Sequence, residues 1–135
     1  MNKLPITEIF NIAKRDKWVI EYDSDLDSLY WSKPKISPST QLKKFLQDFS
    51  LYITKQGLIE GLFIEYAKGN FISHNAEYGE LINKMVKVND MYVLPANKIE
   101  SVEPLLKSMA NMVGNETYNA VRNKGLDLEK FVMTR

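Results

Sequence analysis

Two short runs of aromatic and β-branched residues, separated by a turn-forming segment, constrain the fold of this chain more than any other feature. Trp18–Tyr22 and Ser28–Trp31 have the composition of β-strands. The segment between them, residues 23–27, reads DSDLD, and Asp and Ser side chains stabilise turns by bonding to nearby backbone groups. The pattern therefore predicts a β-hairpin and, with it, an antiparallel sheet.

The signals after this hairpin extend the sheet. Residues 49–53 alternate in the manner of a strand, with apolar residues at every second position. After a glycine-containing turn, residues 58–66 form another strand-like run, in which Gly61 predicts a bulge or a close approach of two backbones. We therefore expect an antiparallel β-meander of four to five strands, with four strands over residues 17–66 and a fifth left open at residues 91–94.

The stretch that joins the two hairpins fits more than one structure. Pro34 and Pro38 predict a loop, because proline donates no backbone hydrogen bond and biases the preceding residue towards extended geometry. Residues 40–47 have the apolar spacing of a helix but also lead directly into the strand pattern at Phe49. Helix and strand both stay open for residues 40–47.

Helical patterns flank the predicted sheet. Apolar residues spaced three and four apart predict a helix at about residues 7–15, and Asn75 precedes a longer helical pattern. We therefore expect an α+β fold in a single domain of residues 1–135, with about three C-terminal helices packed on one face of the sheet. The predicted C-terminal part, residues 75–135, comprises helices at 76–87, 105–113 and 115–124, with Gly114 ending the second, and a last turn or docked tail around Leu128, Phe131 and Val132.

Composition excludes several classes of protein. The chain has no cysteine, which rules out disulfides and thiolate metal sites, and its 44% hydrophobic residues can build an ordinary core. Its 18 basic and 17 acidic residues are mixed along the chain, so no basic face for nucleic acid is evident. No apolar run approaches the roughly 18 residues of a membrane span, and no secretory signal pattern opens the chain. We expect a soluble, cytoplasmic protein.

A recognisable order of small motifs runs from Trp18 to Tyr66. It consists of a Tyr-Asp pair, an isolated Asp, a Leu-Tyr pair, an extended segment, two spaced glycines and an apolar-apolar-Glu run: Tyr22-Asp23, Asp27, Leu29-Tyr30, Asp48 to Tyr52, Gly57, Gly61 and Phe63-Ile64-Glu65. This order resembles the small domain of unknown function numbered 2283. The resemblance implies a small β-meander and no established catalytic residues. The chain departs from that pattern in its longer insert at residues 34–44 and in Lys55-Gln56, where an acidic turn is usual.

The motifs of catalysis and metal binding are incomplete. The acidic turn opens like a calcium loop that starts at Asp23, but Ser28 replaces the glycine at position six and Pro34 the carboxylate at position twelve. His74 is the only histidine, so a multi-histidine metal centre cannot form. We expect no metal and no cofactor. Acid–base chemistry by carboxylates such as Glu60 stays open, since pairing in space is not visible in a sequence.

The leading hypothesis is a non-catalytic protein-interaction module. It would act as a regulatory or inhibitory partner of another protein, for example in an antitoxin-like or defence-related role. A homodimer is a second form of the same hypothesis. Lysines in and after the proline loop and methionines in the C-terminal part are the predicted partner-binding residues, because exposed lysines and adaptable methionines suit such surfaces. They are Lys35, Lys43, Lys44, Met85, Met109 and Met112.

Two alternatives come from other classes. The first is a small enzyme or ligand-binding protein with a cleft between the sheet and the C-terminal helices. The second is single-stranded nucleic-acid binding, in which lysines beside aromatic residues would contact stacked bases, although nearby carboxylates weaken a positive field. If a cleft exists, its predicted lining is Tyr22, Asp23, Asp27, Tyr30 and Trp31.

Overall fold

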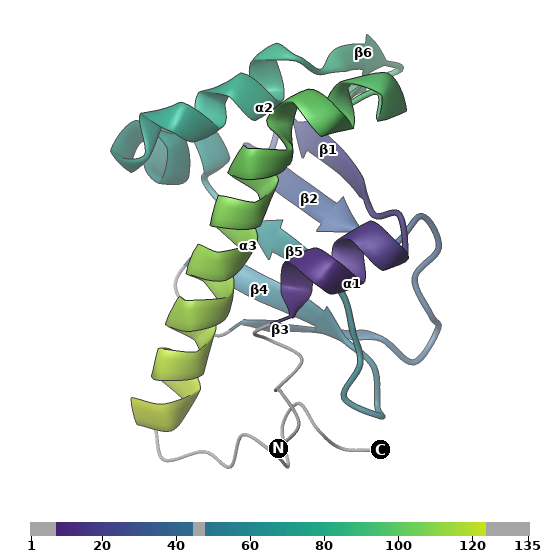
Figure 1. Cartoon of the computed structure of the whole chain (residues 1–135), viewed down its shortest axis with the longest axis vertical. Coiled ribbons are helices and arrows are strands. Elements are labelled where there is room, and N and C mark those ends of the chain that lie inside the picture. The colour runs from purple at the N-terminus through teal and green to yellow at the C-terminus, as the bar shows by residue number, and fades with distance from the viewer. Residues whose placement is uncertain (1–7, 45–47, 124–135) are drawn as a thin grey trace.

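A computed structural model describes residues 8–44 and 48–123, which form one antiparallel sheet with helices against one of its faces (Figure 1). This confirms the α+β class, with seven strands in place of the expected four or five. The strands are β1 (Val19–Asp23), β2 (Ser28–Ser32), β3 (Gln41–Lys44), β4 (Phe49–Ile53), β5 (Ile59–Ile64), β6 (Val86–Val88) and β7 (Met91–Val93). The helices are α1 (Ile9–Arg15), the π-helix η2 (Ala67–Ile72), the short 3-10 helix η3 (Ala76–Tyr78), α2 (Gly79–Asn83) and α3 (Ala96–Asn123).

The strand order is β3-β4-β5-β2-β1-β7-β6, so the predicted meander over residues 17–66 needs a correction. The first hairpin, β1 with β2, is confirmed. The chain then crosses to the far edge, and β3, β4 and β5 return in order until β5 pairs with β2. Burial explains this order, because the polar strand β3 suits an edge whereas the almost fully buried β5 suits the centre. Residues 41–44 are therefore strand, and residues 45–47 lie outside the described part.

A further hairpin, β6 with β7, replaces the end of the helix expected at 76–87. The helical segment ends at Asn83, and Val86 pairs with Val93 instead of continuing the helix. Asn89 has a φ of 57°, the left-handed geometry that a two-residue hairpin turn needs and that Asn tolerates. Asn75 does not cap η3 with its side chain, whose Nδ2 donates to the carbonyl oxygen of Phe71.

The C-terminal half of the described chain contains one long helix where two were expected. Helix α3 runs 28 residues and passes through both Pro104 and Gly114. Gly114 is buried, and its neighbours Val113 and Thr117 are fully buried as well. Burial of this side of α3 outweighs the cost of about 1 kcal/mol that glycine imposes on a helix interior. The tail expected around residues 128–132 lies outside the described residues.

The core lies between the sheet and the helices α1 and α3, which cross the same face (Figure 1). Alternate residues of the central strands supply its floor, among them Ile20 and Leu62. Trp18 and Trp31 meet there edge to face, with ring centroids 5.5 Å apart. Met109 is fully buried, so its place is in the core. None of the helices in the described ranges is long and apolar enough to cross a membrane.

Gly61 combines the two features that its position in the sequence predicted. The register of β4 and β5 shifts beside it, since Tyr52 pairs with Gly61 and Ile53 pairs with Ile59, which leaves Glu60 as the extra residue of a bulge. A Cβ atom on Gly61 would lie 2.4 Å from Cβ of Ser32 and 2.8 Å from its Cα. Only glycine lets β5 pair with β2 at this point.

Replacing Gly61 with alanine should therefore destabilise the fold. We expect the Gly61→Ala variant to lose about 1–3 kcal/mol of unfolding free energy in urea denaturation, because overpacking at a backbone contact forces strands β2 and β5 apart. Gly79→Ala is the matched control, since a Cβ there would sit at an ordinary 3.6 Å from Cγ2 of Ile72. Equal stability of the two variants would contradict this account.

Candidate functional site

The acidic turn is a structural element that connects two parts of the chain. Its first carboxylate, Asp23, accepts hydrogen bonds from the backbone N–H groups of Asp25 and Leu26 at 3.0 and 3.3 Å. Its last carboxylate, Asp27, accepts backbone N–H groups from Lys68 and Gly69 at 2.8 and 2.9 Å, at the start of η2. The turn therefore anchors the segment that follows β5.

Tyr22 and Asp27, two of the residues predicted to line a cleft, are in contact, with the tyrosine hydroxyl donating to the carboxylate at 2.7 Å. Burial would raise the pKa of Asp27, but the hydrogen bonds from Tyr22 and from the Lys68 and Gly69 backbone lower it. Burial, followed by the bond to Asp27, raises the pKa of Tyr22. A carboxylate occupied by three donors is a poor general base, so this pair holds η2 in place.

The five predicted cleft residues do not converge on one site. Tyr22 and Trp31 face the helices and are buried, whereas Tyr30 lies on the opposite face of the sheet and Asp23 stays in the hairpin turn. Strand geometry explains the division, because successive side chains of β2 point to opposite faces. Of the five, only Trp31 lines the pocket between α1, β1 and α3 that is described below.

Glu60, the bulge residue, is the most enclosed carboxylate of the described chain. Its side chain is 6% exposed and pairs with Lys33 at 3.1 Å. Ser37 donates through its backbone N–H at 2.9 Å and through its hydroxyl at 2.7 Å, and the Thr40 hydroxyl donates as well. Burial would raise the pKa of Glu60, but these hydrogen bonds lower it to about 2. Glu60 thus fixes the crossover loop between β2 and β3, and sequence reasoning had left it only as an acid–base candidate.

Metal and nucleophile chemistry find no support in the described residues. These residues contain no group of three or more side chains that could hold a metal ion. His74 is exposed after η2, with Nδ1 at 2.8 Å from the carbonyl oxygen of Asn70. The Ser73 hydroxyl donates to backbone carbonyls of the same turn. Nδ1 of His74 also lies 3.3 Å from the Ser73 hydroxyl, and together these contacts close the turn after η2.

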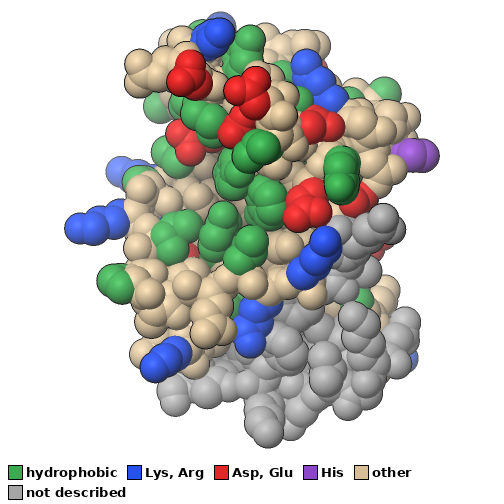
Figure 2. Space-filling view, turned by 180° about the vertical axis from the view of Figure 1, so that it is seen from behind, with side chains coloured by type: hydrophobic (Ala, Val, Ile, Leu, Met, Phe, Trp, Pro, Cys, Tyr) green, Lys and Arg blue, Asp and Glu red, His purple; other side chains and the backbone are tan. Residues whose placement is uncertain are grey.

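The face of the sheet turned away from α1 and α3 carries an aromatic surface. Tyr30 and Phe63 are cross-strand partners with stacked rings 4.9 Å apart, and Tyr52 lies near Tyr30. Figure 2, seen from this side, shows apolar side chains running across the middle of the molecule. We call Leu42, Tyr52, Phe63, Tyr30 and Val93 the aromatic face, since the strand registers place all five on this side.

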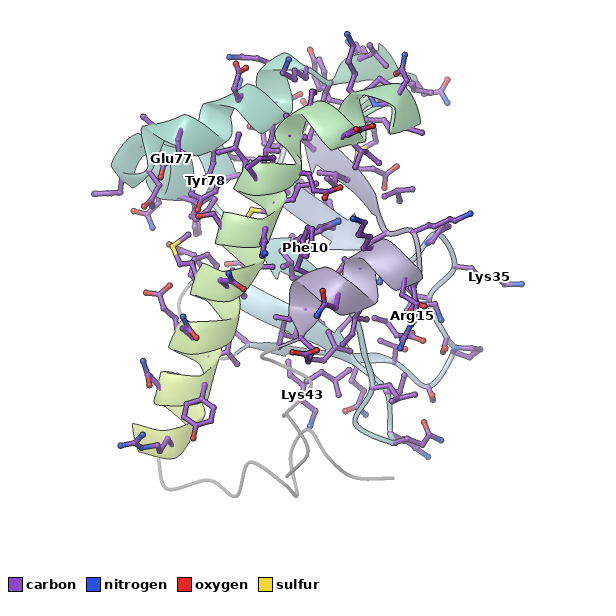
Figure 3. All side chains as sticks on the ribbon, in the orientation of Figure 1. Phe10, Arg15, Lys35, Lys43, Glu77 and Tyr78 are labelled. Atoms are coloured by element: carbon purple, nitrogen blue, oxygen red, sulfur yellow. The ribbon has the colours of Figure 1, made fainter. Side chains whose placement is uncertain are left out.

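Charged residues of both signs border the aromatic face. Lys44, opposite Ser50, lies on the β3 side and makes an exposed ion pair of 3.4 Å with Glu65. Glu21, opposite Tyr30 and Val93, lies on the β1 side. The predicted partner residues are scattered, because Lys43 is on the helix-facing side of β3 and Lys35 projects from the crossover loop (Figure 3). Met85 and Met109 are buried, and Met112 is half-buried.

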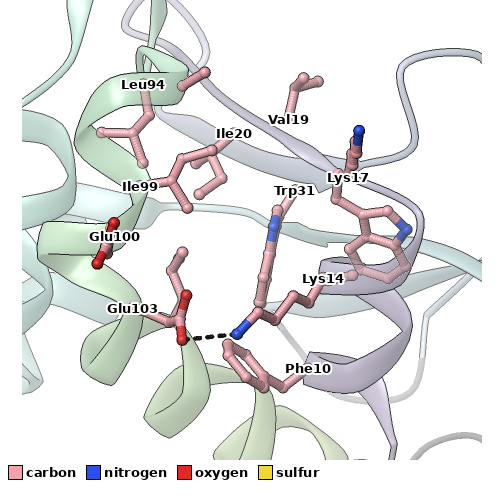
Figure 4. A pocket seen from close by; sticks show the side chains of 14 residues that line it. Phe10, Lys14, Lys17, Val19, Ile20, Trp31, Leu94, Ile99, Glu100 and Glu103 are labelled. Atoms are coloured by element: carbon pink, nitrogen blue, oxygen red, sulfur yellow. Dashed lines mark hydrogen bonds and ion pairs between the residues drawn. The ribbon is translucent and has the colours of Figure 1, made fainter.

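A pocket of about 580 Å³ lies on the other side of the sheet, between α1, β1 and the first turns of α3 (Figure 4). Its apolar wall includes Trp18, Ile20, Trp31 and Leu106. At its mouth the Lys14 ammonium lies 3.2 Å from a carboxylate oxygen of Glu103, which joins α1 to α3. Sequence reasoning missed this pocket, because its residues come from segments almost 90 positions apart.

The negative charge of Glu60 should make the stability of the fold depend on pH. A carboxylate whose pKa is lowered on folding stabilises the fold above its unfolded pKa, and this stability is lost as pH falls from about 4.5 to about 2. We expect Glu60→Gln to cost about 2–3 kcal/mol at pH 7 and progressively less towards pH 2, measured by urea denaturation across that range. The exposed Glu77→Gln is the control (Figure 3). A cost that stays constant with pH would contradict this role.

Comparison of the chain with protein-family models, with curated proteins and with solved structures finds no match. The resemblance of residues 18–66 to the domain of unknown function numbered 2283 therefore stays a prediction. Functional conclusions have to come from the surfaces of the molecule itself.

Proposed function

We propose that this chain is a non-catalytic protein-interaction module whose contact surface is the aromatic face. The observation that carries the proposal is the set of stacked and half-buried rings on a sheet face that no helix in residues 8–44 and 48–123 covers. Exposed apolar patches on a folded domain mark contact surfaces, and aromatic residues are enriched at them.

The central rings are held in place before any partner arrives. Tyr30 and Phe63 stack on each other across two adjacent central strands, β2 and β5. Burial raises the pKa of the Tyr52 hydroxyl, with a smaller contribution from Tyr30, as expected where the rings shield one another from water. A preformed surface loses little conformational entropy on binding, which favours association.

The charge pattern favours a second copy of this chain as the occupant. Lys44 and Glu21 share one cross-strand row with Phe63, each two strands away from it on opposite sides. A two-fold axis that runs along the strands at Phe63 would bring two aromatic faces together with each Lys44 opposite the partner's Glu21. Sheets that pack face to face keep their strands within about 30° of each other, which suits this arrangement.

Nucleic acid fits the same surface poorly. Single-strand binders combine stacking rings with a positively charged groove that follows the phosphates. Around the aromatic face, Glu65 pairs with Lys44 on one border and Glu21 lies on the opposite border, and Figure 2 shows acidic and basic side chains together on this side. The mixed charges favour a protein surface of matching mixed charge.

Phe63→Lys should abolish self-association. We expect the wild-type chain, of 15.6 kDa, to sediment as a dimer at micromolar concentrations and Phe63→Lys to sediment as a monomer, because a buried unpaired lysine would stand at the centre of the contact. Leu26→Lys is the control, since Leu26 is 65% exposed in the turn between β1 and β2, outside the strands that carry the aromatic face. Analytical ultracentrifugation measures both.

The charge pairs give an independent test of the same geometry. Lys44→Glu and Glu21→Lys should each weaken dimerisation by placing like charges opposite each other, and the double variant should restore it. A monomeric wild-type chain, or a dimer that Phe63→Lys leaves intact, would refute the proposal. Capture from the native host of a different protein in place of the second copy, lost in Phe63→Lys, would refute the choice of occupant.

A further inference from the structure

The pocket behind the sheet has a composition unlike that of an ordinary packing gap. Its floor is formed by large apolar side chains, with the Trp31 indole standing along it (Figure 4). The indole N–H of Trp18, which also lines the pocket, is buried and has no hydrogen-bond partner among the described residues. A volume of about 580 Å³ falls within the range of small-molecule sites.

The charges at the mouth are separated by sign. Lys14 and Lys17 come from α1 and the turn after it, whereas Glu100 and Glu103 come from α3 (Figure 4). Lys14 is held by Glu103 at 3.2 Å and lies 6.0 Å from the centre of the Phe10 ring. A cation and an anion thus stand next to each other at the entrance of an apolar chamber.

We propose that this pocket binds a zwitterionic small molecule with a bulky apolar side chain, of the class of free aromatic and large aliphatic amino acids. The carboxylate of the ligand binds the Lys14 ammonium, its ammonium binds the Glu103 carboxylate, and its side chain enters the space beside Trp31. The adjacent opposite charges of an amino-acid head group match the adjacent opposite charges of the Lys14–Glu103 pair.

The ion pair does not close the pocket against such a ligand. The two side chains are 64% and 36% exposed, and exposed ion pairs contribute little stability, so their exchange for contacts with a ligand costs little. Lys17 and Glu100 strengthen the same polarity, because each lies on the side of the mouth that already carries its sign. A ligand with one charge would satisfy one side and be repelled by the other.

The chain carries its own reporter for this binding. Trp18 and Trp31 are the only two tryptophans, and both line the pocket. Fluorescence excited at a wavelength that neither tyrosine nor phenylalanine absorbs therefore reports on the pocket alone. The probes are four forms of phenylalanine. Free phenylalanine carries both charges, and N-acetylphenylalanine carries only the negative charge. Phenylalanine amide carries only the positive charge, and N-acetylphenylalanine amide carries neither.

We expect free phenylalanine to change the tryptophan emission with saturation and to bind at least about ten-fold more tightly than the three blocked forms, as expected for the loss of one charge-assisted contact. Ala96→Phe should weaken binding by filling the mouth, whereas Asn97→Phe, also exposed in the first turn of α3 but outside the pocket lining, should not. These two variants place the same side chain at adjacent exposed positions, one inside the pocket lining and one outside it.

Exchanging the charges of Lys14 and Glu103 distinguishes recognition of the ligand's head group from binding of its apolar side chain alone. Lys14→Glu and Glu103→Lys should each reduce affinity for free phenylalanine, and the double exchange should restore it, since a zwitterion can reverse its orientation. Equal binding of all four probes would overturn the assignment of the head group. The site would be overturned if neither free phenylalanine nor free leucine nor a free tryptophan analogue changed the tryptophan emission with saturation. Equal loss of binding in Ala96→Phe and Asn97→Phe would also overturn it.

Discussion

The pairing of β2 with β5 is the contact on which the rest of the structure depends. Among the strands of residues 8–44 and 48–123, it is the only contact that joins β1, β2, β6 and β7 to β3, β4 and β5. At this joint Gly61 lies against Ser32 so closely that no side chain fits between the two backbones. Next to it, the bulge leaves Glu60 as an extra residue, and this carboxylate holds the crossover loop through Lys33, Ser37 and Thr40. A single irregular point therefore sets both the closure of the sheet and the path of the loop that crosses it.

Local patterns predicted the elements whose stability is local. The hairpin at residues 23–27 followed from its turn chemistry, and the strand with Gly61 followed from its alternation and its glycine. The strand order could not be predicted in the same way. No local pattern near β3 indicates that this strand lies at the edge of the sheet, away from β2. The deciding quantity is burial, which favours the apolar β5 over the polar β3 in the centre, and burial depends on the whole chain.

The two errors in the C-terminal part have a common cause. Met85 and Val86 fit the period of a helix as well as that of a strand, and the left-handed turn at Asn89 decided between them. Gly114 is a helix terminator by local preference but is buried inside α3, where tertiary packing outweighs that preference. The candidate sites were predicted least well, because the pocket joins α1 to α3 across the length of the chain and the aromatic face joins five strands whose order was unknown. Tyr30 and Trp31 were singled out from the sequence, but as members of one cleft.

The alternation of β2 explains why these two neighbours belong to different surfaces. Tyr30 stacks on Phe63 on one face, and Trp31 lines the pocket on the other. Because β2 is paired on both sides, with β1 and with β5, its backbone is fixed and the two surfaces share a rigid wall. A contact made on the aromatic face therefore leaves the pocket mouth open, since α1 and the first turns of α3 stand on the opposite side (Figure 1). The proposed self-association and the proposed ligand binding are thus compatible in one molecule. A substitution on one surface can be tested without altering the other surface.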